Sequence, residues 1–239
     1  MRQLLLTTIV LAALAATPST FHLPPSTSAQ GAWQAIKDDM VITMIIADDY
    51  LASARYDLKN KKFYGTHGGR ITSYNAGIQG IAEFDSEHKE TVGKPFAMTM
   101  TIKGDVMKCT FNGITLDFKR LDDGTKNLTG NWRITQRAGA DGKLAAIHTS
   151  GPRKTIKILS STCFQWAAIN TETGEFLGTG GGNYSFVNGK YTENIEFFSR
   201  DSSRVGMSLT FDGKLEGKDW YHSGKSSRGD AINEVWSRF

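Results

Sequence analysis

Three polar residues in the C-terminal half of the chain could do chemistry together: Gln165, Glu193 and His222. An amide, a carboxylate and an imidazole in an aromatic-lined cavity can orient a ligand through hydrogen bonds. If the three are buried together, the glutamate would hold the histidine charged, or burial alone would raise the pKa of the glutamate. Either arrangement permits proton transfer, so the set is a candidate both for ligand binding and for catalysis.

The inward orientation of these side chains follows from strand alternation, in which every second residue faces the same side. In the stretch 50–56, Arg55 is expected to face water, so its even-numbered neighbours are expected to face inward. An internal repeat carries the same register to 163–170. The predicted ligand-binding residues are Gln165, Tyr191, Glu193, Trp220 and His222. The same register places Tyr50, Ala52, Ala54, Tyr56, Cys163, Ala167, Ile169, Ile195 and Phe197 inside.

A plainer interpretation stands beside the functional one. A slip of one residue in any strand would turn these side chains outward. Glu193 would then be a solvated charge, and His222 a hydrogen-bonded core residue. No closely spaced set of ligating side chains predicts a metal site, and no motif implies a cofactor.

Two glycine-rich stretches resemble phosphate-binding loops at first sight: FYGTHGGRITS at 63–73 and FLGTGGGNYSF at 176–186. Phosphate loops lead into a helix N-terminus, and here neither a helical pattern nor a Lys-Ser/Thr pair follows. Glycine inside strands marks bulges, bends and close backbone approach. We therefore predict a bend in a β-barrel rather than a nucleotide loop.

The two stretches belong to an internal duplication. Shifted by 113 residues, the chain matches itself without a gap from Met40 to Cys109, and fourteen of these seventy positions are identical. Repeats of this kind determine the architecture and must be identified first. At the positions of Gln165, Glu193 and His222, the first half has Ala52, Gly80 and Cys109, so only the second half carries the polar set.

One charged pair is repeated, Glu83 and Glu196. A shared structural role is the favoured interpretation, such as satisfying backbone donors near the glycine bend. A site present in both halves is the alternative.

Each half is a series of short strands separated by turn signals. The pair Asn188-Gly189 is a strong signal for a two-residue hairpin. Regular short strands separated by such turn signals predict an all-β sandwich or an up-and-down barrel. The strands predicted for the second half are 131–137, 144–149, 154–159, 163–170, 176–186, 190–198, 205–212, 218–223 and 231–238.

The ends of the halves carry a further pattern. Each half begins with Gly-x-Trp, GAW at 31–33 and GNW at 130–132, and each closes on a strand that ends in an arginine, Arg120 or Arg238. This resembles the calycin superfamily and, within it, lipocalin-like secreted proteins of Bacteroidetes. The resemblance implies two tandem lipocalin-like antiparallel up-and-down β-barrels.

The same resemblance implies how each barrel closes. A Trp of the first strand would lie beneath an Arg of the last strand, which pairs Trp33 with Arg120 and Trp132 with Arg238. A guanidinium stacked on an indole can close the end of a barrel through cation–π attraction. The chain lacks the other short motifs and the usual disulfide of true lipocalins, and the family implies a fold and a location but no reaction.

The N-terminus predicts export. MRQLLLTTIVLAALA has a basic residue and then an apolar run of secretory-signal length, too short to span a bilayer. Cleavage is expected after Ala29, with Ala15 or Ala16 as the alternative. The expected domains are a signal peptide at 1–29, a first barrel at 30–123 and a second at 124–239. The mature protein is expected to be secreted or periplasmic, with no membrane span.

Composition excludes some partners. The formal net charge is +4 and the longest basic block is KNKK, which calls for neither nucleic acid nor an anionic membrane. Cys109 and Cys163 are expected to be buried free thiols, with a disulfide between them as the alternative.

Three hypotheses for the function remain. The favoured hypothesis is non-catalytic binding of a small, partly apolar ligand or glycan fragment in the C-terminal barrel. The second is a calycin-type isomerase, cyclase or hydrolase that uses Glu193 and His222. The third is a protein-interaction scaffold with filled barrels.

Overall fold

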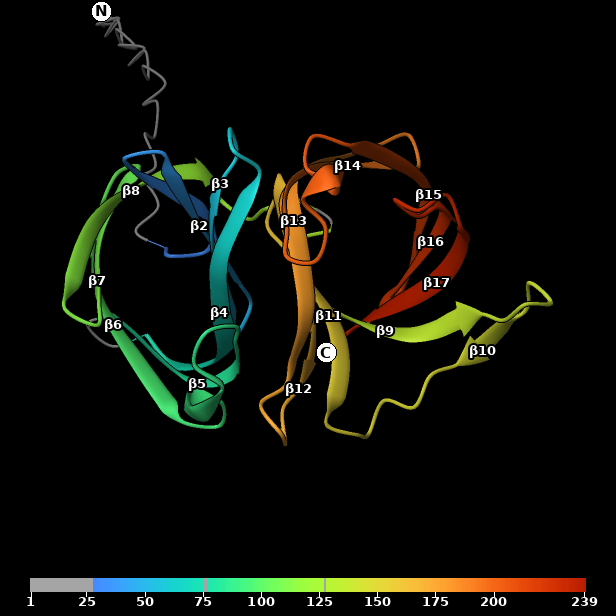
Figure 1. Cartoon of the computed structure of the whole chain (residues 1–239), viewed down its shortest axis with the longest axis horizontal. Coiled ribbons are helices and arrows are strands. Elements are labelled where there is room, and N and C mark those ends of the chain that lie inside the picture. The colour runs from blue at the N-terminus through green and yellow to red at the C-terminus, as the bar shows by residue number, and fades with distance from the viewer. Residues whose placement is uncertain (1–27, 75–76, 127) are drawn as a thin grey trace, which may run out of the picture.

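The computed structural model describes residues 28–74, 77–126 and 128–239. These residues form two closed antiparallel barrels of eight strands each, which lie side by side (Figure 1). The predicted all-β fold with two tandem barrels is confirmed. Most of the expected signal peptide lies outside the described residues.

The first barrel is an up-and-down meander in which each strand pairs with the next and the last pairs with the first. A short 3₁₀ helix, η1 (Lys89–Thr91), follows the fifth strand. The strands are β1 (Gly31–Lys37), β2 (Met40–Ala47), β3 (Tyr50–Asp57), β4 (Lys62–Ser73), β5 (Gly77–Asp85), β6 (Pro95–Lys103), β7 (Val106–Phe111) and β8 (Ile114–Asp122).

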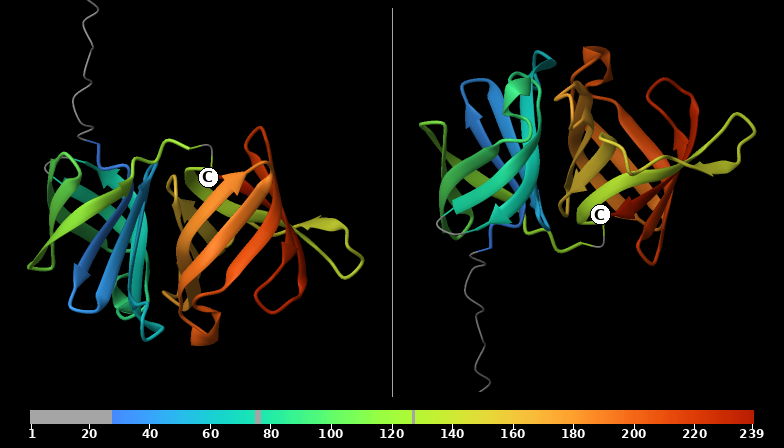
Figure 2. Two further views of the ribbon diagram at one scale, coloured as in Figure 1. Left: turned by 90° about the horizontal axis from the view of Figure 1, so that it is seen from above. Right: turned by 90° about the horizontal axis from the view of Figure 1, so that it is seen from below.

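The second barrel repeats this order with one addition. Its strands are β9 (Gly130–Ala138), β11 (Arg153–Leu159), β12 (Cys163–Asn170), β13 (Phe176–Val187), β14 (Lys190–Phe198), β15 (Ser208–Glu216), β16 (Asp219–Lys225) and β17 (Ala231–Arg238), and β17 pairs with β9 to close it. The extra strand β10 (Leu144–Ala146) pairs with β9 and projects away from the first barrel (Figure 2). The helix η2 (Ser202–Arg204) occupies the place of η1.

The predicted strands of the second half agree with the structure except at two places. The strand predicted at 144–149 is shorter, since β10 ends at Ala146, and the other difference lies near residue 205. The strand predicted at 205–212 is β15, which begins later because η2 and Gly206, with φ of 94°, turn the chain first. Asn188 and Gly189 both have positive φ, at 50° and 74°, and form the predicted two-residue turn between β13 and β14.

Both glycine stretches are strand bends, as predicted. A Cβ on Gly68 or on Gly181 would lie 2.5 Å from the carbonyl oxygen of the neighbouring strand and 2.5 Å from a phenylalanine ring. The rings are Phe84 and Phe197, an identical pair of the repeat. The strand register shifts directly after each of these glycines. Only a hydrogen side chain permits this approach of backbone and ring.

One end of each barrel, which we call its floor, is closed by an arginine over a tryptophan. The guanidinium of Arg120 lies 4.0 Å from the ring centroid of Trp33, and that of Arg238 lies 4.4 Å from Trp132. Both indoles are fully buried. Each indole Nε1 donates 2.8 Å to a carbonyl four residues earlier, that of Ala29 or Leu128.

The barrels pack against each other through the outer faces of β2–β5 and β11–β14. One apolar cluster combines residues of both barrels: Ala32, Ile45, Ala47, Tyr50, Ala52, Phe84, Ile156, Ile158, Cys163, Ala167 and Ile169. A second cluster joins Ala54 and Tyr56 to Phe197. The predicted inward orientation of the even-numbered residues of β3 is therefore wrong, as it is for Cys163, Ala167, Ile169 and Phe197. The outer face is buried by the other barrel, so burial does not identify the inside.

The repeated glutamates serve this interface. Lys154 of the second barrel donates to Glu83 of the first at 3.1 and 3.2 Å. In the opposite direction, Tyr56 of the first barrel donates to Glu196 of the second at 2.6 Å. The shared structural role was predicted correctly, but the described partners are side chains, both across the interface and within the same barrel, rather than backbone donors.

Asp122, at the end of β8, fixes the linker between the barrels. Its carboxylate accepts hydrogen bonds from the turn that joins β11 to β12: from Ser160 Oγ at 2.8 Å, from Thr162 Oγ1 at 2.6 Å and from Thr162 N at 2.8 Å. The connection is thus anchored to the second barrel at the start of the linker.

Candidate functional site

The interiors of the two barrels differ in chemistry. The core of the first barrel is apolar and includes Met44, Met107, Cys109 and Phe118, with Leu116 packed against it. The core of the second is rich in aromatic side chains and holds charged groups among them. Side chains occupy the interior of the second barrel: Tyr191 and Trp220, predicted to line a cavity, are fully buried.

A buried ion pair lies at the centre of the second barrel. Lys157 Nζ on β11 donates 2.7 Å to Glu193 Oε1 on β14, and both side chains are less than a tenth exposed. The ammonium also lies between 5.1 and 5.7 Å from the ring centroids of Phe164, Tyr191, Trp220 and Trp236. Cation–π attraction and the ion pair together compensate for removing this charge from water.

A second polar chain runs from the interior to the surface. His222 Nδ1 on β16 lies 3.7 Å from Glu234 Oε2 on β17. The Glu234 carboxylate accepts hydrogen bonds from Trp236 Nε1 at 3.1 Å, and from Arg137 Nε and an Arg137 terminal nitrogen at 3.1 and 2.8 Å. Glu234 is buried, whereas the side chain of Arg137 is 58% exposed. The chain Arg137–Glu234–His222 therefore connects bulk water to the aromatic interior.

The protonation states follow from burial and from neighbouring charge. Burial lowers the pKa of His222, so the imidazole is neutral at pH 7. Burial also opposes ionisation of Glu234, but His222, Arg137 and Lys157 outweigh it and lower the pKa of that carboxyl to about 2. The hydroxyl of Tyr191 and both ring nitrogens of His222 have no hydrogen-bond partner among the described residues.

Lys157 and Glu234 are site residues that the sequence analysis missed. The repeat carried the signal for Lys157, because Met44 is its counterpart in the first half and apolar residues flank it in TIKIL. Glu234 corresponds to Leu116 when the strands are aligned on Arg120 and Arg238. In both cases a charge replaces an apolar core residue of the same fold.

Gln165 lies outside this site. Its side-chain nitrogen donates 2.7 Å to Thr66 Oγ1 of the first barrel and 3.1 Å to Thr179 Oγ1. The predicted inward orientation of Gln165 is wrong for the same reason as that of Cys163: β12 faces the other barrel. Glu193 and His222 do lie inside, but Glu193 bonds Lys157 rather than His222.

The end of the second barrel opposite its floor, which we call the mouth, holds a pocket of about 560 Å³. It is formed by the end of β9, the end of β14 with the following η2 loop, and the hairpin between β16 and β17. Its lining residues are Arg137, Phe198, Arg200, Asp201, Arg204, Ser226, Ser227, Arg228 and Asp230. Arg137 makes the pocket continuous with the buried chain to His222.

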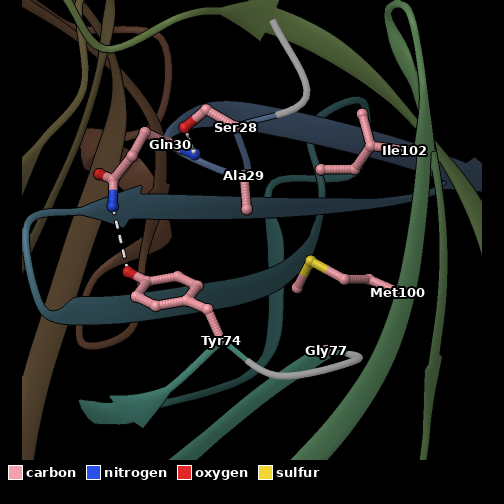
Figure 3. A pocket seen from close by; sticks show the side chains of 7 residues that line it. All are labelled: Ser28, Ala29, Gln30, Tyr74, Gly77, Met100 and Ile102. Atoms are coloured by element: carbon pink, nitrogen blue, oxygen red, sulfur yellow. Dashed lines mark hydrogen bonds between the residues drawn. The ribbon is translucent and has the colours of Figure 1, made fainter.

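A second pocket, of about 490 Å³, lies at the floor of the first barrel (Figure 3). Gln30 Nε2 donates 3.0 Å to the hydroxyl of Tyr74 across one side, and Met100 and Ile102 line another. Among the residues that line it there is no charged side chain. Of these two pockets, the one in the second barrel is lined by charged side chains.

Both cysteines are free and buried, as predicted. Burial raises the pKa of Cys109 to about 11 and that of Cys163 to about 12, so neither thiol is a nucleophile at neutral pH. Within residues 28–74, 77–126 and 128–239, no cluster of three or more His, Cys, Asp or Glu could hold a metal. The helices of that part of the chain are all too short to cross a membrane.

Of the comparisons with known proteins, the one with solved structures gives a match. No family model matches the chain, and no curated protein does. Among solved structures, a lipocalin-like protein from Bacteroides uniformis aligns with 17% sequence identity and a TM-score of 0.33. The alignment covers 47% of this chain and 98% of that protein.

Proposed function

We propose that this is a non-catalytic binding protein whose second barrel holds a small, partly apolar molecule or glycan fragment at its mouth. The pocket volume is in the range of small-molecule sites. Phe198 supplies an apolar wall and packs on Trp166, with ring centroids 5.4 Å apart, so the wall continues into the core.

One observation carries the proposal: among the described residues, the interior of the second barrel holds the ion pair of Lys157 and Glu193, whereas the core cluster of the first barrel is apolar. Met44, Cys109 and Leu116 show that an apolar interior suffices for this architecture. Buried charges cost free energy unless they are fully paired, and replacing them with apolar groups is often neutral or stabilising. Their presence beside a pocket, together with buried polar atoms of His222 and Tyr191 that make no hydrogen bond among the described residues, supports a functional site there.

Export belongs to the same proposal, with the mature protein secreted or periplasmic. The floor of the first barrel favours cleavage at Ala15 or Ala16 over Ala29. Trp33 Nε1 bonds the carbonyl of Ala29, and Arg120 donates to the carbonyls of Ser28 and Gln30 at 3.0 Å. Cleavage after Ala29 would leave a buried indole donor without its acceptor. N-terminal sequencing of the exported protein tests this.

The test of binding is native mass spectrometry of the exported protein beside two variants. Phe198→Ala removes the apolar wall of the mouth pocket, and Tyr74→Ala is the matched control in the pocket of the first barrel. A co-purified molecule lost only in Phe198→Ala supports the proposal. A molecule lost only in Tyr74→Ala moves the site to the first barrel, and bare protein in all three samples favours the scaffold hypothesis.

A further inference from the structure

We propose that the mouth pocket of the second barrel recognises an oxyanion (a carboxylate, sulfate or phosphate group) on its ligand. The inference rests on the proposed function and names the chemical class that the site takes. Four of the nine residues that line the pocket are arginines: Arg137, Arg200, Arg204 and Arg228. They come from three separate segments that only the closed barrel brings together.

The arginines retain donors for a ligand. A guanidinium has five N–H groups, and its fork matches the geometry of carboxylate and phosphate. Arg137 uses two of them on Glu234, and Arg204 donates to Asp201 Oδ2 at 2.9 Å and to the carbonyl of Ser227. Arg200 donates to the carbonyl of Leu177. Among these described contacts, each guanidinium keeps at least one terminal nitrogen unused.

The acidic residues in and beside the pocket already accept hydrogen bonds or are fewer than its arginines. Asp201 accepts from Ser203 N and Ser203 Oγ as well as from Arg204. Glu234 forms an ion pair with Arg137 and offsets its charge. Asp230 is the other acidic residue of the lining, which also contains Arg200 and Arg228. The pocket therefore has an excess of positive charge and of hydrogen-bond donors, which is the chemistry that selects an anion.

The first barrel supplies an internal control for this assignment. Its equivalent loop, 85–93, reads DSEHKETVG, whereas 198–206 reads FSRDSSRVG. Both loops contain a 3₁₀ helix at the same place. Glu87 stands where the second barrel has Arg200, and Thr91 where it has Arg204. The fold accepts either charge on this loop, so the shared architecture does not require the arginines of the second barrel.

The pocket also has one apolar side, formed by Phe198 against Trp166. An oxyanion attached to an apolar chain or to a sugar ring would place its charge on the arginines and its body on Phe198. Two ligand classes carry this chemistry, an apolar acid and an acidic glycan fragment.

The experiment measures binding to the whole exported chain by NMR of the arginine Nε–Hε groups, at constant ionic strength set with NaCl. Sulfate and inorganic phosphate are the first probes, with millimolar affinity expected. Two matched pairs follow: decanoate with decanol, and glucuronate with glucose. In each pair the first compound carries a carboxylate and the second is uncharged. Tighter binding of decanoate than of glucuronate indicates an apolar ligand, and the reverse indicates a sugar.

Two variants locate the site, and a third controls for general charge. Arg200→Gln and Arg228→Gln should each weaken binding of the acid about tenfold, because each removes a charge-assisted hydrogen bond. Arg153→Gln alters an exposed arginine outside the pocket and should leave binding unchanged. Unaltered near-ultraviolet circular dichroism shows that each variant is folded.

The outcomes separate this inference from the proposed function. Equal binding of acid and neutral partner at the mouth overturns anion recognition and leaves ligand binding intact. Equal weakening in Arg153→Gln overturns the assignment to the pocket. No saturable shift with any anion overturns the inference, and the mass-spectrometric test then decides the proposed function independently.

Discussion

At the scale of single residues, the Lys157–Glu193 pair shows how a barrel core can hold a charge. Four aromatic rings surround the ammonium and one carboxylate pairs with it. Such a pair is strongly coupled, because removing one member leaves the other charged, buried and unpaired.

A double-mutant cycle tests this coupling. Lys157→Met introduces the residue of the first barrel and should lower the free energy of unfolding by about 3–5 kcal/mol, because Glu193 is left without its partner. The single variant Glu193→Leu completes the cycle, and the double variant Lys157→Met/Glu193→Leu should recover much of that loss. Urea denaturation followed by tryptophan fluorescence measures it, since four of the five tryptophans lie in the second barrel. Additive losses would show that the pair is not coupled.

His222 predicts a specific pH dependence. Burial lowers its pKa in the folded protein below the ordinary value of about 6.5. As the pH falls below about 6.5, the unfolded chain binds a proton that the folded chain excludes, so stability is lost on acidification. Burial also lowers the pKa of His67, in the first barrel, in the same direction.

The measurement is the free energy of unfolding between pH 5 and 8. His222→Gln and His67→Gln should each reduce its slope, and the double variant should be nearly independent of pH above pH 5. Glu234 contributes at lower pH: with a folded pKa of about 2, its contribution is complete above about pH 4.5 and is lost as the pH falls toward 2. An unchanged slope in His222→Gln would contradict the assignment of a buried neutral imidazole.

At the scale of elements, β4 and β13 determine how each barrel bends. Their glycines let a neighbouring carbonyl and a phenylalanine ring approach the backbone, and the register shift beside them turns the following side chains. This shift is why Ile195 faces the interior of the second barrel while Phe197, two residues on, faces the first barrel.

Gly181→Ala should therefore destabilise the second barrel by about 1–3 kcal/mol or more, because the added Cβ would meet the Phe164 carbonyl and the Phe197 ring at 2.5 Å. Gly151→Ala is the control, since the nearest atom to its Cβ would be 3.5 Å away, on a histidine ring. Thermal denaturation compares the two. Equal shifts in the midpoint would contradict the close approach as the reason for glycine.

At the scale of the whole molecule, the two barrels form one body. Apolar clusters, the Asp122 contacts and the two reciprocal glutamate contacts join them. Because these contacts bury the outer faces of β3 and β12, we expect the barrels to unfold together in a single cooperative transition.

Lys154→Glu tests this expectation. The variant places a second carboxylate beside Glu83 at the interface, where both side chains are less than a fifth exposed, and like charges there repel strongly. Scanning calorimetry should show one transition for the natural protein and two for the variant. Lys190→Glu is the matched control, because it breaks an exposed pair with Asp212 and should leave one transition.

The sequence by itself determined the architecture. Glycine positions, the Asn188-Gly189 turn and the 113-residue repeat are local or periodic signals, and they report backbone geometry directly. The same signals identified the bends and nearly all the strands of the second half. They also placed Glu193 and His222 inside the second barrel.

Only the tertiary structure decided which face of each central strand is the interior. Strand alternation separates two faces, but it distinguishes inside from outside only when one of them is wet. Here the second barrel covers the outer face of the first, so Tyr56 and Gln165 are buried in an interface that no pattern within one strand reveals. The arginine pocket likewise unites residues of three segments, which become neighbours only when β17 closes on β9.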